Sequence, residues 1–123
     1  MKYFAGSDVS LDETAICVVD EDGIVVTEGK AASEPDDLVR WLVATVLTIT
    51  RVGLEARPLS PWLHTELRAA GLPAICIETR RMKGATAAMA VKTERNDARA
   101  IAHAIRVGWF TVVHVKVSAR LSR

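Results

Sequence analysis

The fold of this chain is decided by residues 2–30, which read KYFAGSDVSLDETAICVVDEDGIVVTEGK. Apolar and alternating runs predict three strands there, over residues 2–9, 14–20 and 24–30. The acidic turn with glycine at 21–23 predicts a hairpin between the second and third strands. The second strand is continuously apolar, which predicts a central place in the sheet, covered on both faces.

After residue 30, helical and strand patterns alternate. Ser33 is the predicted N-cap of a helix whose apolar stripe runs to Ile49. Later elements are expected as a strand over 51–55, a helix from Ser60 to a stop at Gly71, a strand over 74–77 and a helix from Glu94 to about Gly108. The order β-β-β-α-β-α-β-α predicts an α/β fold with a mixed sheet and helices on both faces.

Length and composition fit a small globular domain. The chain has 123 residues, half of them apolar, which suits one domain over residues 1–110 followed by a tail over residues 111–123. The start of this tail, residues 111–117, is strand-like. Cys17 and Cys76 lie inside apolar runs without metal-like spacing, so we expect reduced thiols in a cytoplasmic protein. The longest apolar run is too short to span a bilayer, so no membrane partner is expected.

The net charge of +1 hides an asymmetry along the chain. Residues 1–50 carry ten acidic and three basic side chains, whereas residues 51–123 carry five acidic and thirteen basic ones. The second part could present a basic surface to a polyanion, or the two parts could neutralise each other in the folded protein.

Two acids, Glu94 and Asp97, stand three residues apart at the start of the last predicted helix. This spacing places both carboxylates on one face, beside the apolar stripe that packs inward. Acids turned toward a core need a cationic partner, and a divalent metal is one such partner. The plainer interpretation is that acids in a first helical turn favour the positive end of the helix dipole. The inward stripe consists of Ala98, Ile101, Ala102 and Ile105.

Two further acids end predicted strands. Asp8 ends the first strand and Glu55 ends the fourth, so both would meet Glu94 and Asp97 if these strands are neighbours. Carboxylates are the ligands that Mg²⁺ prefers, and a pair of ions can activate an attacking oxygen and stabilise a leaving one at phosphorus. The alternatives are that Asp8 forms a turn and that Glu55 pairs with Arg57.

The same residues carry a resemblance to a known family. The chain resembles the DEDD transposases of bacterial insertion sequences, which are related to the Piv and MooV invertases. The likeness covers nearly the whole chain and rests on five segments, Gly6-Ser7-Asp8-Val9-Ser10, Gly53-Leu54-Glu55-Ala56, residues 58–63, Cys76-Ile77-Glu78-Thr79-Arg80 and residues 92–98.

The resemblance implies an RNase H-like, RuvC-like catalytic domain over residues 1–110 of a bacterial cytoplasmic transposase. It implies Mg²⁺-dependent DNA cleavage and strand transfer, with two ions (Mn²⁺ as a substitute) held by Asp8, Glu55, Glu94 and Asp97. Family members act as oligomers on DNA, and many use a structured non-coding RNA as a guide. Nearby basic side chains would contact nucleic-acid phosphates. The candidates are Arg80, Arg81, Lys83, Lys92, Arg95 and Arg99.

Three features depart from the family pattern. Glu94 stands where the family has aspartate, which lengthens the ligand by one methylene. Arg57 stands close to the site, where a small residue is expected, and would crowd the ions or replace one electrostatically. The C-terminal domain that carries the family's serine nucleophile is absent, so we expect the isolated chain not to complete recombination.

Two other function classes compete with the transposase domain. An actin-like or sugar-kinase half also opens with an aspartate on its first strand, but it needs a glycine-rich phosphate loop there. Residues 9–11, Val-Ser-Leu, do not provide such a loop. A non-catalytic module that binds nucleic acid or dimerises would carry the same acids as remnants.

Overall fold

Six strands form one mixed sheet. The computed structural model describes residues 1–78 and 94–115, without the side chains of residues 94–96. The strand order is β3-β2-β1-β4-β5-β6. β1 pairs antiparallel with β2 and parallel with β4, and β4 pairs parallel with β5. The strands are β1 (Tyr3–Val9), β2 (Glu13–Asp20), β3 (Val25–Ala32), β4 (Ile49–Glu55), β5 (Ala74–Glu78) and β6 (Thr111–Val112).

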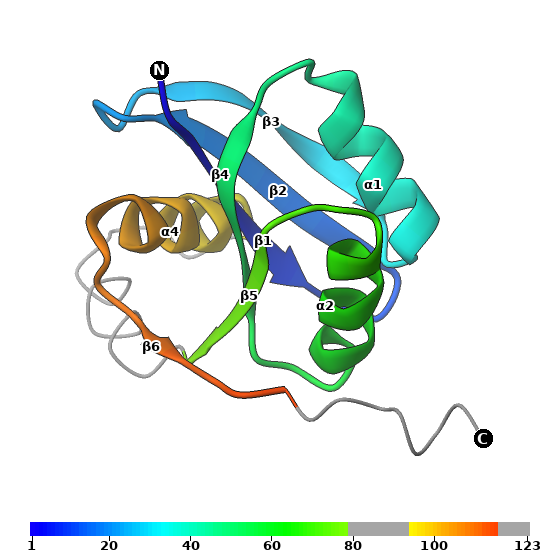
Figure 1. Cartoon of the computed structure of the whole chain (residues 1–123). Helices are drawn as coiled ribbons and strands as arrows, with labels where there is room; N and C mark the ends of the chain where they lie inside the picture. Colours follow the sequence, from blue (N-terminus) through cyan, green and yellow to red (C-terminus); the bar gives the residue numbers. More distant parts are fainter. Residues whose placement is uncertain (79–93, 116–123) are drawn as a thin grey trace.

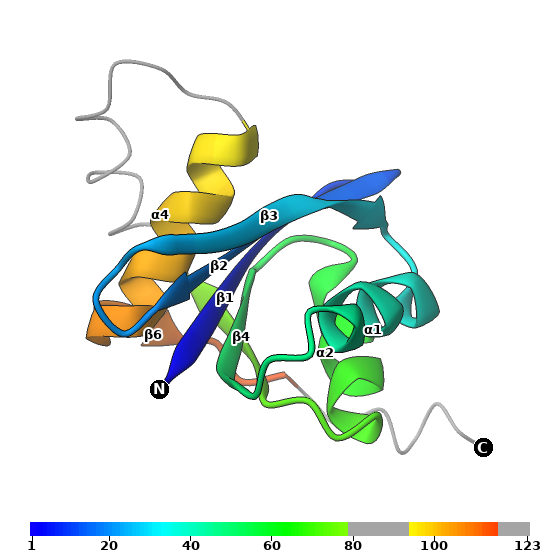
Figure 2. The same ribbon diagram turned by 90° about the horizontal axis from the view of Figure 1, so that it is seen from above.

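The described helices cover both faces of this sheet, as the sequence predicts. α1 (Pro35–Ala44) and α2 (Ser60–Ala69) lie on one face, and α4 (Glu94–Val107) lies on the other. Figure 2 shows the sheet nearly edge-on between these two helical layers. The apolar stripe of α4 is buried as predicted, and Gly108 follows the helix with a positive φ of 78°.

β2 has the central position that its continuous apolar run predicts. It lies between β3 and β1, and only its two end residues escape burial. Ile16 and Val18 enter the core beneath α1 and α2, whereas Cys17 and Val19 enter the core beneath α4. Residues 15–19 of the strand are all apolar because each face of β2 is covered by a helical layer.

The predicted order of elements needs one addition. β6 pairs antiparallel with β5 through Ile77 and Val112. The strand-like residues 111–117 form a strand only over Thr111–Val112 within the described residues, and both residues of this short strand are exposed. Val113 and Val115 then pack against the core beneath α1 and α2.

The first helix differs from its prediction at both ends. Its N-cap is Glu34, not Ser33, and no side chain caps it. The buried Ser33 hydroxyl instead donates to the Ser10 carbonyl at 2.5 Å and bonds the Thr14 hydroxyl at 2.8 Å. The helix ends at Ala44, and Ile49 belongs to β4. The helical spacing of apolar residues continues to Ile49 because β4 contributes to the same core as α1.

Cys17 and Cys76 are both buried thiols, as expected. Burial raises the pKa of the Cys76 thiol to about 11, so this thiol stays protonated at neutral pH. None of the described helices combines the length and the hydropathy that crossing a bilayer requires.

Candidate active site at the ends of β1 and β4

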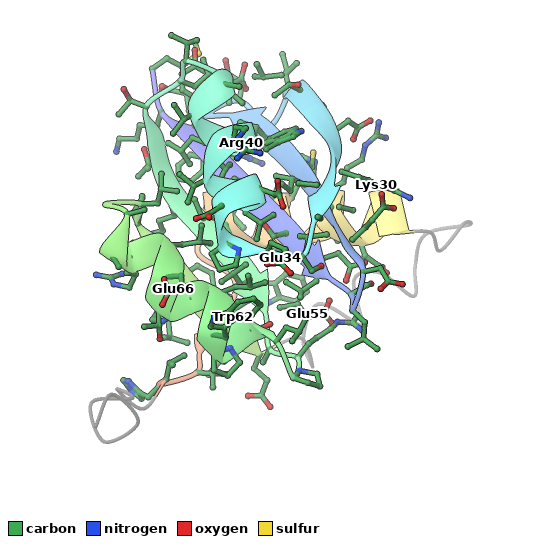
Figure 3. All side chains as sticks on the ribbon, turned by 90° about the vertical axis from the view of Figure 1, so that its right-hand side faces the viewer. Lys30, Glu34, Arg40, Glu55, Trp62 and Glu66 are labelled. Atoms are coloured by element: carbon green, nitrogen blue, oxygen red, sulfur yellow. The ribbon has the colours of Figure 1, made fainter. Side chains whose placement is uncertain are left out.

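Two neighbouring parallel strands place Asp8 and Glu55 side by side. β1 and β4 pair in register through Gly6 and Gly53 and then through Ser7 and Leu54. Asp8 and Glu55 are the next residues along each strand, and because side chains alternate, both share the α4 face with the two glycines. Asp8 is 2% exposed and Glu55 is 8% exposed, so both carboxyls lie inside the protein. Figure 3 shows Glu55 near the first turn of α2.

The two glycines allow α4 to approach this end of the sheet. A Cβ atom on Gly6 would lie 2.3 Å from the backbone nitrogen of Ala102, and one on Gly53 would lie 2.5 Å from Ile105 Cδ1. Real Cβ contacts are not this short. At Gly6 the added atom would meet the backbone of α4, so this position requires glycine, whereas at Gly53 the side chain of Ile105 would have to shift.

Asp97 reaches the same region from the start of α4. It is half-buried, and its charge acts on both Asp8 and Arg57. The structure therefore places three of the four predicted acids within electrostatic reach of one another. The side chain of the fourth, Glu94, lies outside the described residues.

Arg57 lies between the two strand-end acids. Its Nη2 atom is 3.2 Å from Asp8 Oδ1 and 3.0 Å from Glu55 Oε1. The contact with Glu55 is a hydrogen bond. Asp8 Oδ1 is buried and accepts no hydrogen bond from the described residues. Of the two expectations for Glu55, pairing with Arg57 is therefore what the structure shows.

Burial and neighbouring acids change the protonation of Asp8. Burial raises its pKa most, hydrogen bonding with Glu55 raises it further, and the charges of Glu55 and Asp97 act in the same direction. Arg57 opposes these effects, and the resulting pKa is about 7. A substantial fraction of Asp8 is therefore protonated at neutral pH.

The donor atoms fit a hard divalent cation. Mg²⁺ takes oxygen ligands, and Oδ1 of Asp8 is a buried oxygen that accepts no hydrogen bond from the described residues, although Arg57 Nη2 lies 3.2 Å away. Asp8 and Glu55 are the residues that would hold such an ion, and Asp97 would have to move closer to join them. In the described side chains, no three acids, histidines or cysteines are grouped closely enough to hold one ion together. Arg57 takes the place that a shared cation would need.

Ser60 holds the loop that carries Arg57, a role that the sequence analysis missed. Its hydroxyl is fully buried, donates to the Glu55 carbonyl and accepts the Arg57 backbone N–H at 3.0 Å. The sequence signal is a hydroxyl residue three positions after Arg57 and five after Glu55. The same serine also fits the start of a helix, so the sequence alone does not indicate its contacts with the loop.

Two cavities adjoin Arg57. One, of about 560 Å³, is lined by Arg57, Ser60, Cys76 and His114 among others. The other, of about 300 Å³, lies between the β1–β2 turn and the loop after β4, with Arg57 again in its wall. Arg57 therefore contributes to the walls of both cavities.

Among the predicted nucleic-acid contacts, only Arg99 has a described side chain. Its guanidinium forms a two-pronged ion pair with Glu28 of β3, at 3.0 Å and 2.7 Å. Its contact with nucleic acid remains a prediction. The other five candidates, Arg80, Arg81, Lys83, Lys92 and Arg95, lie outside the described side chains.

Comparisons with known proteins bear on the fold. No protein-family model and no curated protein sequence matches the chain. Among solved structures, RuvC of T. thermophilus in complex with a Holliday junction substrate is 16% identical, with a TM-score of 0.63 over 92% of this chain and 100% of that one. A second structure of Thermus thermophilus RuvC is also 16% identical, with a TM-score of 0.61 over 90% of this chain and 99% of that one.

A more distant likeness is to EutJ, the ethanolamine utilization protein of Carboxydothermus hydrogenoformans. It is 17% identical, with a TM-score of 0.51 over 71% of this chain and 40% of that one. At these identities the likenesses concern the fold alone. The chain therefore has the RuvC-like α/β architecture that the sequence predicts.

Proposed function

We propose that this chain is a metal-dependent phosphoryl-transfer domain that acts on DNA. The observation that carries the proposal is the arrangement of Asp8 and Glu55 at the ends of adjacent parallel strands, with Asp97 brought to them by α4. The RuvC-like fold supports it, and so does the Holliday junction bound to one similar structure. DNA is accordingly the partner we propose.

At finer detail, the proposed activity is that of a DEDD transposase of a bacterial insertion sequence. This proposal keeps Glu94 as the fourth acid, residues 1–110 as the catalytic unit, a homo-oligomer and a structured guide RNA. It rests on the sequence motifs. The RuvC-like fold is compatible with it without distinguishing a transposase from other nucleases.

The chain's own residues have distinct tasks in this proposal. Asp8 and Glu55 supply oxygens at a rigid sheet end, and Asp97 adds a third carboxylate from α4. A divalent ion bound there would polarise a phosphate and activate the attacking oxygen. Asp8 must release its proton before it can act as a ligand, because metal ligands are deprotonated.

Mn²⁺ titration by calorimetry tests the proposal, with wild type, Asp8→Ala and the surface control Asp37→Ala. We expect saturable binding by wild type and by Asp37→Ala, and none by Asp8→Ala, because Asp37 pairs only with Arg40 on the exposed side of α1. A four-way DNA junction should then bind more tightly with Mn²⁺ than with a chelator. Absence of Mn²⁺ binding at millimolar concentration would reject the metal-dependent activity.

A second candidate is a non-catalytic nucleic-acid-binding or dimerisation module. The contact of Arg57 with both Asp8 and Glu55 favours it, because paired acids need no metal to satisfy them. DNA binding that is unaffected by a chelator and by Asp8→Ala would identify this module. An actin-like or sugar-kinase half is the weaker candidate and predicts ATP binding.

A further inference from the structure

We infer that Arg57 is a tethered cation that competes with divalent ions for Asp8 and Glu55, and so sets the affinity of this site for metal. The inference rests on the proposed function. It assigns to one residue of this chain the control of when the site accepts an ion.

The guanidinium of Arg57 is close to both acids. One nitrogen, Nη2, lies within 3.2 Å of an oxygen of each acid, so a single positive group serves two carboxylates. Both carboxylates are largely shielded from solvent, with side-chain exposures of 3% for Asp8 and 11% for Glu55. A divalent ion bridging the same oxygens would face strong repulsion from this guanidinium at close range.

The backbone of Arg57 is held by hydrogen bonds, whereas its side chain is partly exposed. Ser60 accepts the Arg57 N–H at 3.0 Å and also bonds the Glu55 carbonyl, which holds the loop to the end of β4. Arg57 lines two cavities and its side chain is 41% exposed. It can therefore leave the acids without movement of the loop that carries it.

The contact of Arg57 with Asp8 is an ion pair without a hydrogen bond. Arg57 forms a hydrogen bond to Glu55, yet Asp8 Oδ1 remains without a hydrogen-bond donor among the described residues. Arginine can satisfy a carboxylate through two parallel hydrogen bonds. Arg57 instead forms one hydrogen bond to Glu55 and none to Asp8 Oδ1. The site thus keeps a buried oxygen that an ion would satisfy better.

Calorimetric Mn²⁺ titration at pH 8 tests the inference on wild type, Arg57→Thr and the matched control Arg40→Thr. Arg40 is also an arginine paired with an acid, but it is exposed on α1. Arg57→Thr should lower the Kd for Mn²⁺ on the order of tenfold, the size of change typical of groups that surround metal ligands. Arg40→Thr should leave the Kd unchanged, which excludes a simple effect of net charge.

A thermal melt provides a second readout and guards against misfolding. Without metal, Arg57→Thr should melt below wild type, because two buried carboxyls lose their counter-charge, and Mn²⁺ should restore more of its Tm than of the wild-type Tm. Arg57→Lys keeps the charge and should retain a Kd near that of wild type.

The outcomes separate this inference from the proposed function. If wild type binds Mn²⁺ and folded Arg57→Thr binds it no more tightly, the competition is rejected and the metal-dependent function stands. If neither protein binds Mn²⁺, both are rejected. Tighter binding by Arg57→Thr that is abolished in the double variant Asp8→Ala/Arg57→Thr supports both.

Discussion

At the scale of single residues, the buried carboxyl of Asp8 is the most informative group in this chain. It lies in the interior beside two other acids and one guanidinium, and its pKa rises to about 7 from an ordinary value of 3.8. A buried ion pair of this kind contributes little net stability, because desolvation of the charges offsets their attraction. The arrangement is therefore better explained by function than by stability.

Asp8 should make the folded protein less stable as the pH rises. Between pH 4 and pH 7 the folded state holds a proton on Asp8 that the unfolded chain has released, so unfolding becomes easier with rising pH. Relative to Asp8→Asn, the wild-type free energy of unfolding should fall by about 4 kcal/mol from pH 4 to pH 8. Urea denaturation of both proteins across this range measures the difference.

Comparison with Asp8→Asn isolates this effect from the histidines. Burial lowers the pKa of His64 and of His103, with nearby arginines acting in the same direction. Their contribution to stability increases with pH up to about 6.5, opposite to that of Asp8. Both proteins contain these histidines, so a difference that stays flat from pH 4 to pH 8 would contradict the assigned protonation of Asp8.

Ser60→Ala should destabilise the protein by about 2 kcal/mol, because it removes the partner of two backbone groups near the site. The hydroxyl is fully buried and bonds both the Glu55 carbonyl and the Arg57 N–H. Thr65→Ala on the same helix is the control, since its hydroxyl bonds only the Pro61 carbonyl near the surface. Equal denaturation midpoints for the two variants would refute this role of Ser60.

At the scale of elements, the contact between α4 and the β1–β4 pair creates the site. Gly6 and Gly53 face each other across the two strands, and the helix lies directly on both. The sequence predicted each strand and the helix separately, and it predicted that their acids would converge if the strands were neighbours. It did not indicate that two paired glycines make the convergence possible.

Gly6→Ala should destabilise the protein by about 3 kcal/mol, because its Cβ would meet the backbone of α4 at Ala98 and Ala102. Gly29→Ala is the matched control on β3, where the new Cβ would meet only the side chain of Trp41, at 3.0 Å. This control should cost about 1 kcal/mol, since a side chain can shift. Chemical denaturation of the two variants gives the comparison.

A consequence for the site follows from the same substitution. A displaced α4 would carry Asp97 away from Asp8, so Gly6→Ala should also weaken Mn²⁺ binding, whereas Gly29→Ala should not. A Gly6→Ala protein as stable as Gly29→Ala would show that α4 is not held in direct contact with β1.

At the scale of the whole molecule, the sheet has two cores, one on each side. β1, β2, β4 and β5 lie inside the sheet, whereas β3 and β6 are its edges. Amide hydrogen exchange should therefore be slowest in β1, β2 and β4 and fastest in β6, which has two exposed residues. Mass spectrometry of peptic peptides measures this order, and protection of β6 equal to that of β1 would contradict the assigned edge.

The strands and helices were predictable because local periodicity reports burial. The faces of β1 and α4 were also predictable, since apolar residues recur at the spacing of each element. The missed features lack such a pattern. Ser33 takes a tertiary partner instead of capping a helix, and α1 ends before an apolar run does. The strand-like tail did indicate β6, but a strand of two residues is too short for its pairing with β5 to follow from periodicity.

The sequence by itself determined the order of elements, the central position of β2 and the identity of the acids, because these depend on residue type and spacing along the chain. Only the tertiary structure decided that Arg57 takes the position between Asp8 and Glu55, and that Ser60 holds it there. Contacts of this kind depend on distances between side chains brought together by strand pairing and by the loop after β4. The raised pKa of Asp8 is decided in the same way, because burial and neighbouring charge exist only in the folded protein.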